Sequence, residues 1–372
     1  MWFRRMSLED WFDAYQYRTR YDVGESAVKF LKVSDLGIDL SAVELRYGYH
    51  TGRPELREQI AQEYDGLSGD HVLVTSGGAE AIFAITAALV RPGDHVIVEH
   101  PNYPSTYEVA RGLGCEVTLL PLALEHRFRP ELDRLDALVT PRTKLMIFTH
   151  PNNPTGSMIE RFDLERLVRF AESRRIHLLF DETYRHLAFG EPLPPAASLS
   201  PWAISVTSMS KCYGLPGIRI GWLATKSQEV LDGVLAVREQ VTITNSALGE
   251  TIATAVLARR EEFLARAKAH VRANLAVVTR WMATEREHLQ WIPPEGGVVS
   301  LPRIIADRAA RDPETLYRSL AEDHHVFVIP GRCFEVDNQF FRLGFGAAQE
   351  ELAAGLKRIA SALKEFAGSA PA

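Results

Sequence analysis

Short apolar runs alternate with amphipathic stretches along the first two thirds of the chain. The apolar runs, rich in aliphatic and β-branched residues, span 71–76, 94–101, 115–122, 144–151, 176–182, 203–210 and 218–225. Helix-like patterns lie between several of them, at 77–90, 104–113 and 163–175. Buried strands that alternate with helices indicate an α/β fold with a mostly parallel sheet. Such sheets bind ligands beyond the carboxyl ends of their strands, so the residues that end each run are the first candidates for a site.

The pattern changes after about residue 226, where long helical stretches replace the alternation. Shorter strand-like runs follow at 296–302, 326–331 and 340–346, before a final helix. Because neither end of the chain looks able to fold alone, we expect the first residues to join the last ones. This predicts an N-terminal segment (1–45) that packs with a small C-terminal domain (276–372), and a large domain (46–275) between them.

Composition narrows the class of protein without identifying it. The 372 residues, 46% of them hydrophobic, suffice for one large or two moderate domains, and the net charge of -6 argues against a nucleic-acid partner. No apolar run reaches the roughly 18 residues of a membrane span, and the first residues lack the apolar stretch of a signal peptide. Cys115, Cys212 and Cys333 are too far apart for a disulfide framework or a metal-binding pattern. We therefore expect a cytoplasmic protein with no membrane partner and no metal site.

Two strand ends carry glycines or an aromatic ring. Strand residues lead through Gly77, Gly78 and Ala79 into a helix, and free N–H groups at a helix start bind anions such as phosphate. A plain structural turn is an equal alternative there, since the Walker lysine and the dinucleotide spacing are missing. Prolines lie on both sides of Tyr103, whose ring offers a flat face to a planar ligand; a core tyrosine is the alternative.

Two further strand ends add polar groups. Asn153 lies in a loop of two asparagines between prolines, where a turn needs only one of them, and its amide can donate a hydrogen bond to a ligand oxygen. Asp181 ends an apolar run, either as a helix cap, which is the commoner case, or as the partner of a buried cation. Tyr184, three residues later, can face the same space.

The last strand end carries a lysine. Lys211 is one of only eight lysines in the chain, and Ser208, Ser210 and Arg219 place anion-binding groups around it. A lysine in such surroundings can act as a nucleophilic amine and form a Schiff base with an aldehyde. The residues at these strand ends together suit a ligand with a phosphate, an aromatic ring, a phenolic oxygen, a basic ring nitrogen and an aldehyde. That ligand is pyridoxal 5'-phosphate (PLP). Its sites pair a Schiff-base lysine with a carboxylate at the ring nitrogen.

These residues resemble the motifs of fold-type I PLP-dependent enzymes of the class I and II aminotransferase family. The likeness runs from about Tyr21 to the final helix. "SMSKCYGLPGIRIGW" is similar to the family's S-x-S-K-x-x-x-x-x-G-x-R-x-G, and "SGGAEA", "NNPTG" and "DETY" occur in the family's order. The resemblance implies a mostly parallel sheet in a large domain, plus a smaller α+β domain built from both termini. It also implies transamination of an L-α-amino acid through internal aldimine, external aldimine and quinonoid.

The resemblance implies a role for each residue at the strand ends. Lys211 would carry the cofactor, with Asp181 on the ring nitrogen, Tyr184 and Asn153 near the phenolic oxygen, and Tyr103 stacked on the ring. Lys211, Asp181 and Tyr184 are thus the catalytic candidates. Phosphate binding would fall to Gly77, Gly78, Ala79, Ser208, Ser210 and Arg219.

Substrate and subunit contacts follow from the same resemblance. "FFRLGFG" makes Arg342 the fork that holds the substrate α-carboxylate, with Gly24 of "DVGES" and Asn153 beside it. "YGYHTGRPELREQIA" resembles the stretch that sends a tyrosine, here Tyr47, to the phosphate of the neighbouring subunit. The implied assembly is a homodimer with shared active sites.

A narrower resemblance concerns the edges of the motifs. "LEDWF", "PEGGVVSLPR" and "IPGRCF" resemble capreomycidine-synthase-like enzymes and the related enduracididine cyclases. Those enzymes eliminate the hydroxyl of a hydroxylated arginine and close a guanidine ring. The likeness makes Glu9 a candidate contact for a guanidinium. The chain departs from that group near Lys29, where the cyclases carry a histidine, which shuttles protons near neutrality far better than lysine does.

Four functions remain open, in a definite order. Transamination comes first, because "DETY" is intact as in an ordinary aminotransferase, and cyclisation of a hydroxyarginine is a close second. A β- or γ-eliminating lyase is third. A ligand-sensing module of a regulator is the non-enzymatic alternative. It comes last because such modules usually carry a DNA-binding domain, no basic domain precedes the fold, and both Lys211 and Asp181 are present.

Overall fold

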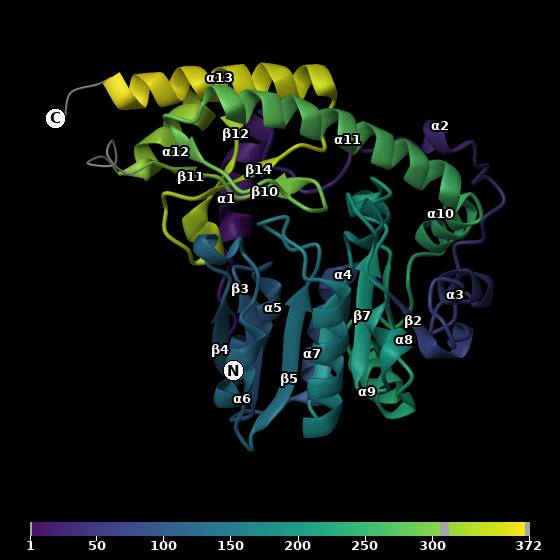
Figure 1. Ribbon diagram of the computed structural model, residues 1–372. Helices are drawn as coiled ribbons and strands as arrows, with labels where there is room; N and C mark the ends of the chain where they lie inside the picture. The colour runs from purple at the N-terminus through teal and green to yellow at the C-terminus, as the bar shows by residue number, and fades with distance from the viewer. Residues whose placement is uncertain (1, 306–311, 369–372) are drawn as a thin grey trace.

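The computed structural model describes residues 2–305 and 312–368, and its centre is a seven-stranded sheet (Figure 1). The strand order is β2-β8-β7-β6-β5-β3-β4. The strands are β2 (Val72–Thr75), β3 (His95–His100), β4 (Glu116–Pro121), β5 (Thr143–Thr149), β6 (His177–Asp181), β7 (Ala203–Ser208) and β8 (Gly221–Ala224). Strands β4, β3, β5, β6 and β7 pair in parallel, and β8 runs antiparallel to both of its neighbours. The predicted mostly parallel sheet is therefore confirmed.

Helices cover both faces of this sheet, which explains why its strands are continuous apolar runs. One face carries α4 (Gly78–Leu89), α5 (Ser105–Gly112) and α9 (Gln228–Glu239), and the other carries α6 (Leu135–Leu138), α7 (Arg161–Arg174) and α8 (Ala196–Leu199). Alternate residues of a strand point to opposite faces, so Val96 and Val98 pack on the α4 side and Ile97 packs on the α7 side. The carboxyl ends of the parallel strands stay free for ligands.

The remaining strands belong to a smaller assembly, in the upper part of Figure 1, that is built from both ends of the chain. β1 (Tyr21–Asp22) pairs in parallel with β12 (Val326–Phe327), and the Trp11 indole donates a hydrogen bond to the carbonyl of Val328 at 2.8 Å. The other elements are α1 (Ser7–Tyr15), β9 (Leu289–Gln290), β10 (Val299–Ser300), β11 (Arg303–Ile304), α12 (Pro313–Glu322), β13 (Ile329–Pro330), β14 (Phe341–Gly344) and α13 (Gln349–Gly368). The N-terminal segment thus packs with the C-terminal part.

Three helices lie beside the edge of the sheet that β2 forms. They are α3 (Pro54–Ala61), α10 (Ala247–Leu257) and α11 (Arg260–Thr284), and the short α2 (Val33–Leu36) precedes them. α11 crosses from this edge to the smaller assembly, where it packs along α13 (Figure 1). The predicted domain boundary between residues 275 and 276 falls inside α11.

Several predicted strands are shorter in the structure than in the sequence pattern. The run at 218–225 forms a strand only over Gly221–Ala224, because Pro216–Ile218 is a 3-10 helix and Arg219 has a φ of 55°. The run at 326–331 splits, since Val326–Phe327 pairs with β1 and Ile329–Pro330 pairs with β14. Apolar periodicity marks burial, and it does not report which partner each residue takes.

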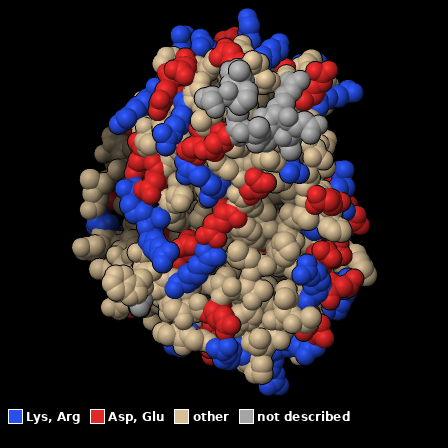
Figure 2. Space-filling view, turned by 90° about the vertical axis from the view of Figure 1, so that its left-hand side faces the viewer, with Lys and Arg blue, Asp and Glu red and all other residues tan. Residues whose placement is uncertain are grey.

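Charges of both signs are interspersed over the molecular face shown in Figure 2, with no large area of a single sign. No helix among the described residues is both long and apolar enough to cross a membrane.

Candidate active site

Polar residues from several strand ends meet in one cavity of about 480 Å³. It lies at the carboxyl ends of β5, β6 and β7, where a sheet of this kind binds its ligands. The sequence-predicted residues that line it are Glu9, Gly78, Ala79, Tyr103, Asn153, Asp181, Tyr184, Ser208, Ser210, Lys211, Arg219 and Arg342. Residues from the first tenth and the last tenth of the chain thus share a cavity with the strand ends between them.

Lys211 lies in the turn after β7 and lines this cavity. Its Nζ donates to Oγ of Ser26 at 3.0 Å and to a carboxylate oxygen of Glu25 at 3.3 Å. The N–H of Val28 donates to the Lys211 carbonyl, so the two segments are also tied through the main chain. Burial raises the pKa of Glu25, but the charges of Lys211 and Arg342 outweigh burial and leave that pKa below its ordinary value. Glu25 is therefore an ionised partner for the cations of the site.

The start of α4 and the loop after β7 form a cradle for an anion. Gly77 has a φ of 85°, and a Cβ atom there would lie 2.6 Å from the Arg219 guanidinium, so only glycine fits. Arg219 donates to the carbonyl of Ser76 at 3.2 Å, which holds the guanidinium against this loop. The Ser208 hydroxyl accepts from the N–H of Ser210 at 3.3 Å. Helix N–H groups, two hydroxyls and a guanidinium together suit a phosphate.

Asp181 ends β6 and is buried beneath the cavity. Its carboxylate accepts from the N–H of Thr183 at 3.0 Å, and the chain continues as a turn and a short 3-10 helix (Arg185–Leu187). Asp181 therefore does not cap an α-helix, which was the alternative. Burial raises the pKa of Asp181, so a cationic group brought against it would stabilise the ionised form. Tyr103, in the loop after β3, lines the same cavity.

Tyr184 and Asn153 both make protein contacts in the described structure. The Tyr184 hydroxyl donates to the carbonyl of Ser26 at 2.6 Å, a bond that the sequence prediction did not include. The amide oxygen of Asn153 accepts from Arg342 at 3.1 Å. Two more hydrogen bonds of that guanidinium, at 2.7 and 3.2 Å, go to the carbonyl of Gly24. Arg342 is thus held on two sides, as a group that orients a ligand must be.

Gly24 is a glycine for steric reasons. A Cβ atom there would lie 2.8 Å from the ring of Phe327, which belongs to the strand that pairs with β1. The close approach brings the Gly24 carbonyl to Arg342, which is itself buried. Burial lowers the pKa of Arg342, so the guanidinium favours an anionic partner.

One face of α1 completes the cavity, and sequence reasoning found only one of its residues. Leu8, Glu9, Phe12 and Gln16 line the cavity at helical spacing. Burial raises the pKa of Glu9, while the charges of Arg342 and Lys211 act against that shift. Other lining residues that the sequence prediction missed are Tyr17, Glu25, Ser26, Ile82, Thr149, Thr183 and Pro216. The amphipathic pattern over 8–16 predicts a buried helix face, but it does not separate a cavity wall from a core face.

Tyr47 is the one predicted cofactor residue that lies elsewhere. Its side chain is 81% exposed and belongs to a separate hollow, shared with Tyr49, Arg53 and Glu250. Tyr47 does not line the Lys211 cavity of its own chain, and the predicted role toward a second subunit remains a prediction.

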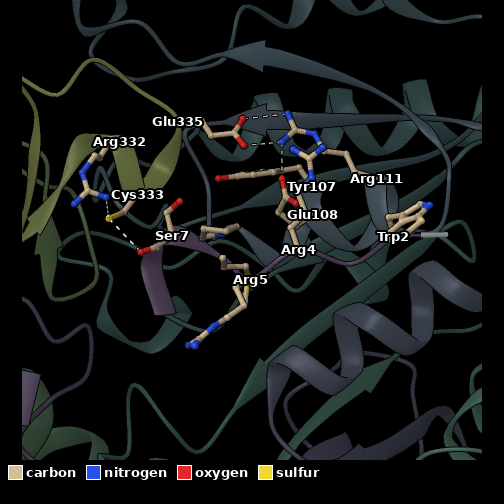
Figure 3. Close-up of a pocket in the computed structure, with 12 residues that line it drawn as sticks. Trp2, Arg4, Arg5, Ser7, Tyr107, Glu108, Arg111, Arg332, Cys333 and Glu335 are labelled. Carbon is tan, nitrogen blue, oxygen red and sulfur yellow. Dashed lines mark hydrogen bonds and ion pairs between the residues drawn. The ribbon is translucent and has the colours of Figure 1, made fainter. Parts of the chain in front are cut away.

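A second cavity, of about 470 Å³, lies between the N-terminal residues and the residues around Tyr107, Arg111 and Glu335 (Figure 3). It is rich in arginine, but Arg111 is already bound by Glu335 at 2.6 and 3.1 Å and by Glu108 at 2.6 Å. Burial raises the pKa of the Cys333 thiol there to about 12, so it is not a ready nucleophile. The groups suited to catalysis therefore gather in the Lys211 cavity.

The family model for aminotransferase class I and II matches residues 15–359. The chain belongs to this family. Among its relatives, capreomycidine synthase of Streptomyces vinaceus is 30% identical over 367 residues, which cover 96% of this chain and 93% of that protein.

Two solved structures extend the comparison of this aminotransferase-family chain. A PLP-dependent aminotransferase from Streptococcus suis superposes with a TM-score of 0.93 and 31% identity over the whole of both chains. The PLP-dependent cyclase OrfR superposes with a TM-score of 0.90 and 32% identity over 98% of both chains. The predicted fold-type I architecture and the predicted cofactor are confirmed, and the protein is a PLP-dependent enzyme.

The residues of the cavity fit this cofactor. An amine on Lys211, a buried carboxylate on Asp181 and an aromatic ring on Tyr103 match its aldehyde, its ring nitrogen and its ring face. The cradle beside Gly77 and Arg219 matches its phosphate.

Proposed function

We propose that this PLP-dependent enzyme is an aminotransferase that acts on an L-α-amino acid. The observation that carries the proposal is the placement of an amine, a buried carboxylate and a buried guanidinium around one cavity, in Lys211, Asp181 and Arg342. When bound, PLP supplies an electron sink that stabilises negative charge at the substrate Cα. The chain supplies the binding, the orientation and the proton transfers.

Arg342 holds the α-carboxylate of the substrate. A guanidinium has five N–H donors, and three of them bind Gly24 and Asn153. Nε donates one of these bonds, and each of the two terminal nitrogens donates one. Each terminal nitrogen carries two N–H groups, so each keeps one N–H for a ligand. That pair of donors is the fork that a carboxylate accepts in bidentate fashion.

Lys211 removes and returns the Cα proton, because its amine is the one basic nitrogen of the cavity that is not a guanidinium among the described lining residues. Ser26 and Glu25 accept hydrogen bonds from its ammonium form. Asp181 keeps a proton on the ring nitrogen, since a buried carboxylate there favours a cationic partner. Tyr103 stacks on the ring, and Ser208, Ser210, Arg219 and the start of α4 hold the phosphate.

A half-reaction tests the proposal. Holoenzyme mixed with single amino acids and no keto acid should release one keto acid per active site and then stop. Addition of a keto acid should restore turnover, because it returns the amino group. Continuous consumption of an amino acid without any acceptor would contradict transamination.

Cyclisation of a hydroxyarginine is the second candidate. Two observations favour it: the carboxylates of Glu9 and Glu25 line the cavity, and capreomycidine synthase and the cyclase OrfR are among the similar proteins. Carboxylates suit a guanidinium side chain. Lys29 is exposed and stands near where the cyclases carry a histidine, which favours transamination.

The same assay separates these candidates. A cyclase would consume hydroxyarginine catalytically and release neither a keto acid nor ammonia. A β- or γ-eliminating lyase, the third candidate, would release both from a suitable substrate without an acceptor.

We propose further that the protein is a cytoplasmic homodimer with shared active sites, with no nucleic-acid or membrane partner. Leu45, Tyr47 and Tyr49 are large, exposed and close in sequence, and Val241 and Ile243 are exposed nearby. The two segments are adjacent in space, because His50 binds Glu239 at 3.0 Å. Contiguous exposed apolar residues mark an interface.

A further inference from the structure

Behind the cavity, two buried groups form a pair that the reaction does not use. Glu99 is the last residue but one of β3, and His150 directly follows the end of β5. Both side chains are fully buried, and Nε2 of His150 lies 3.0 Å from a carboxylate oxygen of Glu99. The contact does not meet hydrogen-bond geometry, and neither atom has a hydrogen-bonding partner elsewhere in the described part of the chain.

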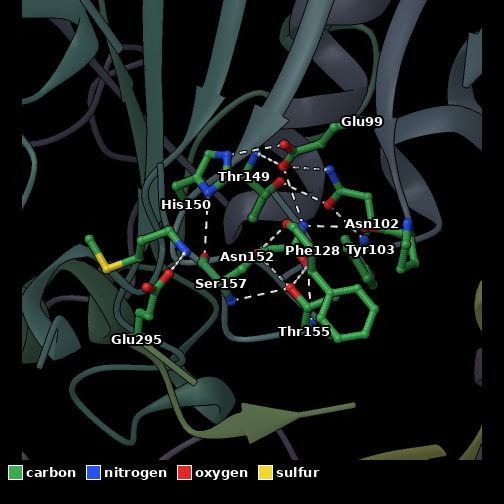
Figure 4. A network of polar contacts seen from close by, with 12 residues as sticks. Glu99, Asn102, Tyr103, Phe128, Thr149, His150, Asn152, Thr155, Ser157 and Glu295 are labelled. Atoms are coloured by element: carbon green, nitrogen blue, oxygen red, sulfur yellow. Dashed lines mark hydrogen bonds and ion pairs between the residues drawn. The ribbon is translucent and has the colours of Figure 1, made fainter. Parts of the chain in front are cut away.

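The donors around the pair define its charge. The other oxygen of Glu99 accepts from the N–H of Thr149 at 2.5 Å and from the amides of Asn152 and Asn102 at 3.3 and 3.5 Å (Figure 4). Nδ1 of His150 lies 3.4 Å from the carbonyl of Ser157, which can only accept.

The contact favours a hydrogen on Nε2 of His150. A lone pair on Nε2 of His150 would face a carboxylate at 3.0 Å in a water-free interior, and neither group could escape the repulsion. Nδ1 faces the carbonyl of Ser157, which also can only accept, so a hydrogen on each ring nitrogen suits both contacts, and such an imidazolium balances the charge of Glu99.

The pair touches the supports of three cofactor-binding elements. Asn102, which binds Glu99, also accepts from the N–H of Tyr103 at 2.7 Å. Asn152, the other amide on Glu99, precedes Asn153 and binds the N–H of Thr155 at 3.1 Å.

The third element is the strand that ends at Asp181, whose main-chain carbonyl accepts from the N–H of His150 at 3.1 Å. The negative charge of Glu99 acts to raise the pKa of Asp181 further, beyond the effect of burial. An imidazolium at His150, 3.0 Å from Glu99, would offset that charge.

We infer that Glu99 and His150 act together as a neutral positioning pair, which keeps a second negative charge away from Asp181 and fixes the loops that carry Tyr103 and Asn153. The inference rests on the proposed role of Asp181 at the ring nitrogen. It predicts that a variant that leaves one of the two charges unpaired is perturbed more than a variant that lacks both charges.

The test is a pH titration of the visible absorbance of the holoenzyme without substrate. The groups whose charges bear on Asp181 are Glu99 and Lys211, with the Thr183 hydroxyl and N–H as hydrogen-bond donors and Tyr103 close by. His150→Gln leaves Glu99 uncompensated, and a negative charge near the cofactor favours its protonated form. The midpoint of the absorbance change should therefore rise by about half a pH unit or more.

The double variant Glu99→Gln/His150→Gln removes both charges and should return the midpoint to the wild-type value. His177→Gln provides a matched control, because this partly buried histidine lies at the opposite end of β6 and should leave the midpoint unchanged. Thermal unfolding of the apoproteins should follow the same order, with His150→Gln less stable than the double variant, since an unpaired buried charge is costly.

An unshifted midpoint in folded His150→Gln, or a double variant displaced as far as the single one, would overturn the inference. Asp181→Asn in the same titration identifies the cause. If that variant shifts the midpoint while His150→Gln does not, the pair has no electrostatic role although Asp181 keeps its own. If neither variant shifts it, the ring-nitrogen assignment fails as well. Neither result bears on the keto acid assay, which measures products.

Discussion

The carbonyl of Gly24 accepts two hydrogen bonds from the guanidinium of Arg342, a residue 318 positions further along the chain. Immediately after Gly24, Glu25 and Ser26 bind the ammonium of Lys211. One short segment near the start of the chain therefore contacts both the guanidinium that we propose binds the substrate carboxylate and the amine that we propose moves the proton. The cavity therefore forms only when the segments that contain Gly24, Lys211 and Arg342 are brought together.

Lys211→Ala should abolish turnover while the protein keeps its fold, because the Schiff-base partner and the proton carrier are both lost. Loss of the proton transfer alone lowers rates by about 100- to 10,000-fold. Borohydride reduction of the wild-type holoenzyme, followed by peptide mapping, should place the cofactor on Lys211. Lys357→Ala changes an exposed lysine of α13 and serves as the control. A labelled peptide that contains any other lysine would contradict the assignment.

Asp181→Asn should lower the rate by about 100- to 1000-fold, as expected when one preorganised electrostatic group is removed. The same substitution should raise the stability of the apoprotein. Burial raises the pKa of Asp181 in the folded apoprotein, so the stability that this group contributes is present at low pH and is lost as the pH rises through that value. The apo variant should therefore unfold at a higher temperature than wild type at pH 8. Near-normal turnover of the cofactor-loaded variant would rule out the proposed role.

Arg342→Lys should weaken substrate binding although the charge is retained, because an ammonium cannot reproduce the two-pronged fork. The loss of one charge-assisted hydrogen bond predicts a fall in kcat/KM of about 10- to 100-fold. Arg358→Lys is a suitable control, since Arg358 contacts Tyr21 and the carbonyl of His324 away from the cavity. Steady-state kinetics with the preferred amino acid measure both variants. Equal kcat/KM values in Arg342→Lys and wild type would remove Arg342 from the substrate site.

Subunits that carry Tyr47→Phe and subunits that carry Lys211→Ala should complement one another if active sites are shared. In the mixed dimer one site would hold both lesions, and the other would hold Lys211 and Tyr47 intact. Verified heterodimers should recover about half of the wild-type activity per dimer at limiting cofactor, where the loss of a phosphate contact matters most. The two parent homodimers, assayed under the same conditions, are the controls. Heterodimers no more active than the parents would count against sharing.

Glu63, which lies outside the cavity, should make part of the free energy of unfolding sensitive to acid. It is buried among His186, at 2.7 Å, Arg260, at 3.2 Å, and Arg185. Burial raises the pKa of Glu63, but its hydrogen bond to His186 and the three neighbouring charges outweigh burial and lower that pKa to about 2. The contribution is therefore present above the ordinary value of 4.5 and is lost as the pH falls toward 2.

Glu63→Gln should accordingly lower the free energy of unfolding by about 3 kcal/mol at pH 7, given about 1.4 kcal/mol per pH unit. Urea unfolding at pH 7 and at pH 3 should show the difference from wild type shrinking at the lower pH. Glu261→Gln, an exposed change on α11, should cost little at either pH. A pH-independent difference would mean that the loss comes from packing and not from charge.

Much of the sheet and its ligand edge is predictable from the sequence, because a buried parallel strand needs an unbroken apolar run and ends where polar residues begin. Asp181 and Lys211 stand out for that reason. Leu8 and Phe12 of α1 do not, since apolar residues at helical spacing describe a core face and a cavity wall equally well.

Bonds between distant segments were also beyond the sequence pattern. The hydroxyl of Tyr184 binds the carbonyl of Ser26, which is 158 residues away. No sequence pattern marks a main-chain carbonyl as the partner of a distant side chain. The pairing of Glu99 with His150 depends on the register of β3 and β5, and periodicity leaves register unspecified. The proposed role of Tyr47 depends on a second subunit, which the pattern of one chain does not describe.

The pairing of β1 with β12 has a consequence for how the protein is made. During synthesis the front of a chain emerges first and domains generally fold as they appear. Residues 21–28 leave the ribosome long before their partners in β12 and at Arg342, which lie after the whole central sheet in the sequence. The central sheet can fold while the ribosome is still elongating the chain, whereas the cavity closes only after β12 and Arg342 have emerged. A nascent chain stalled before residue 326 should therefore contain a folded sheet and no competent active site.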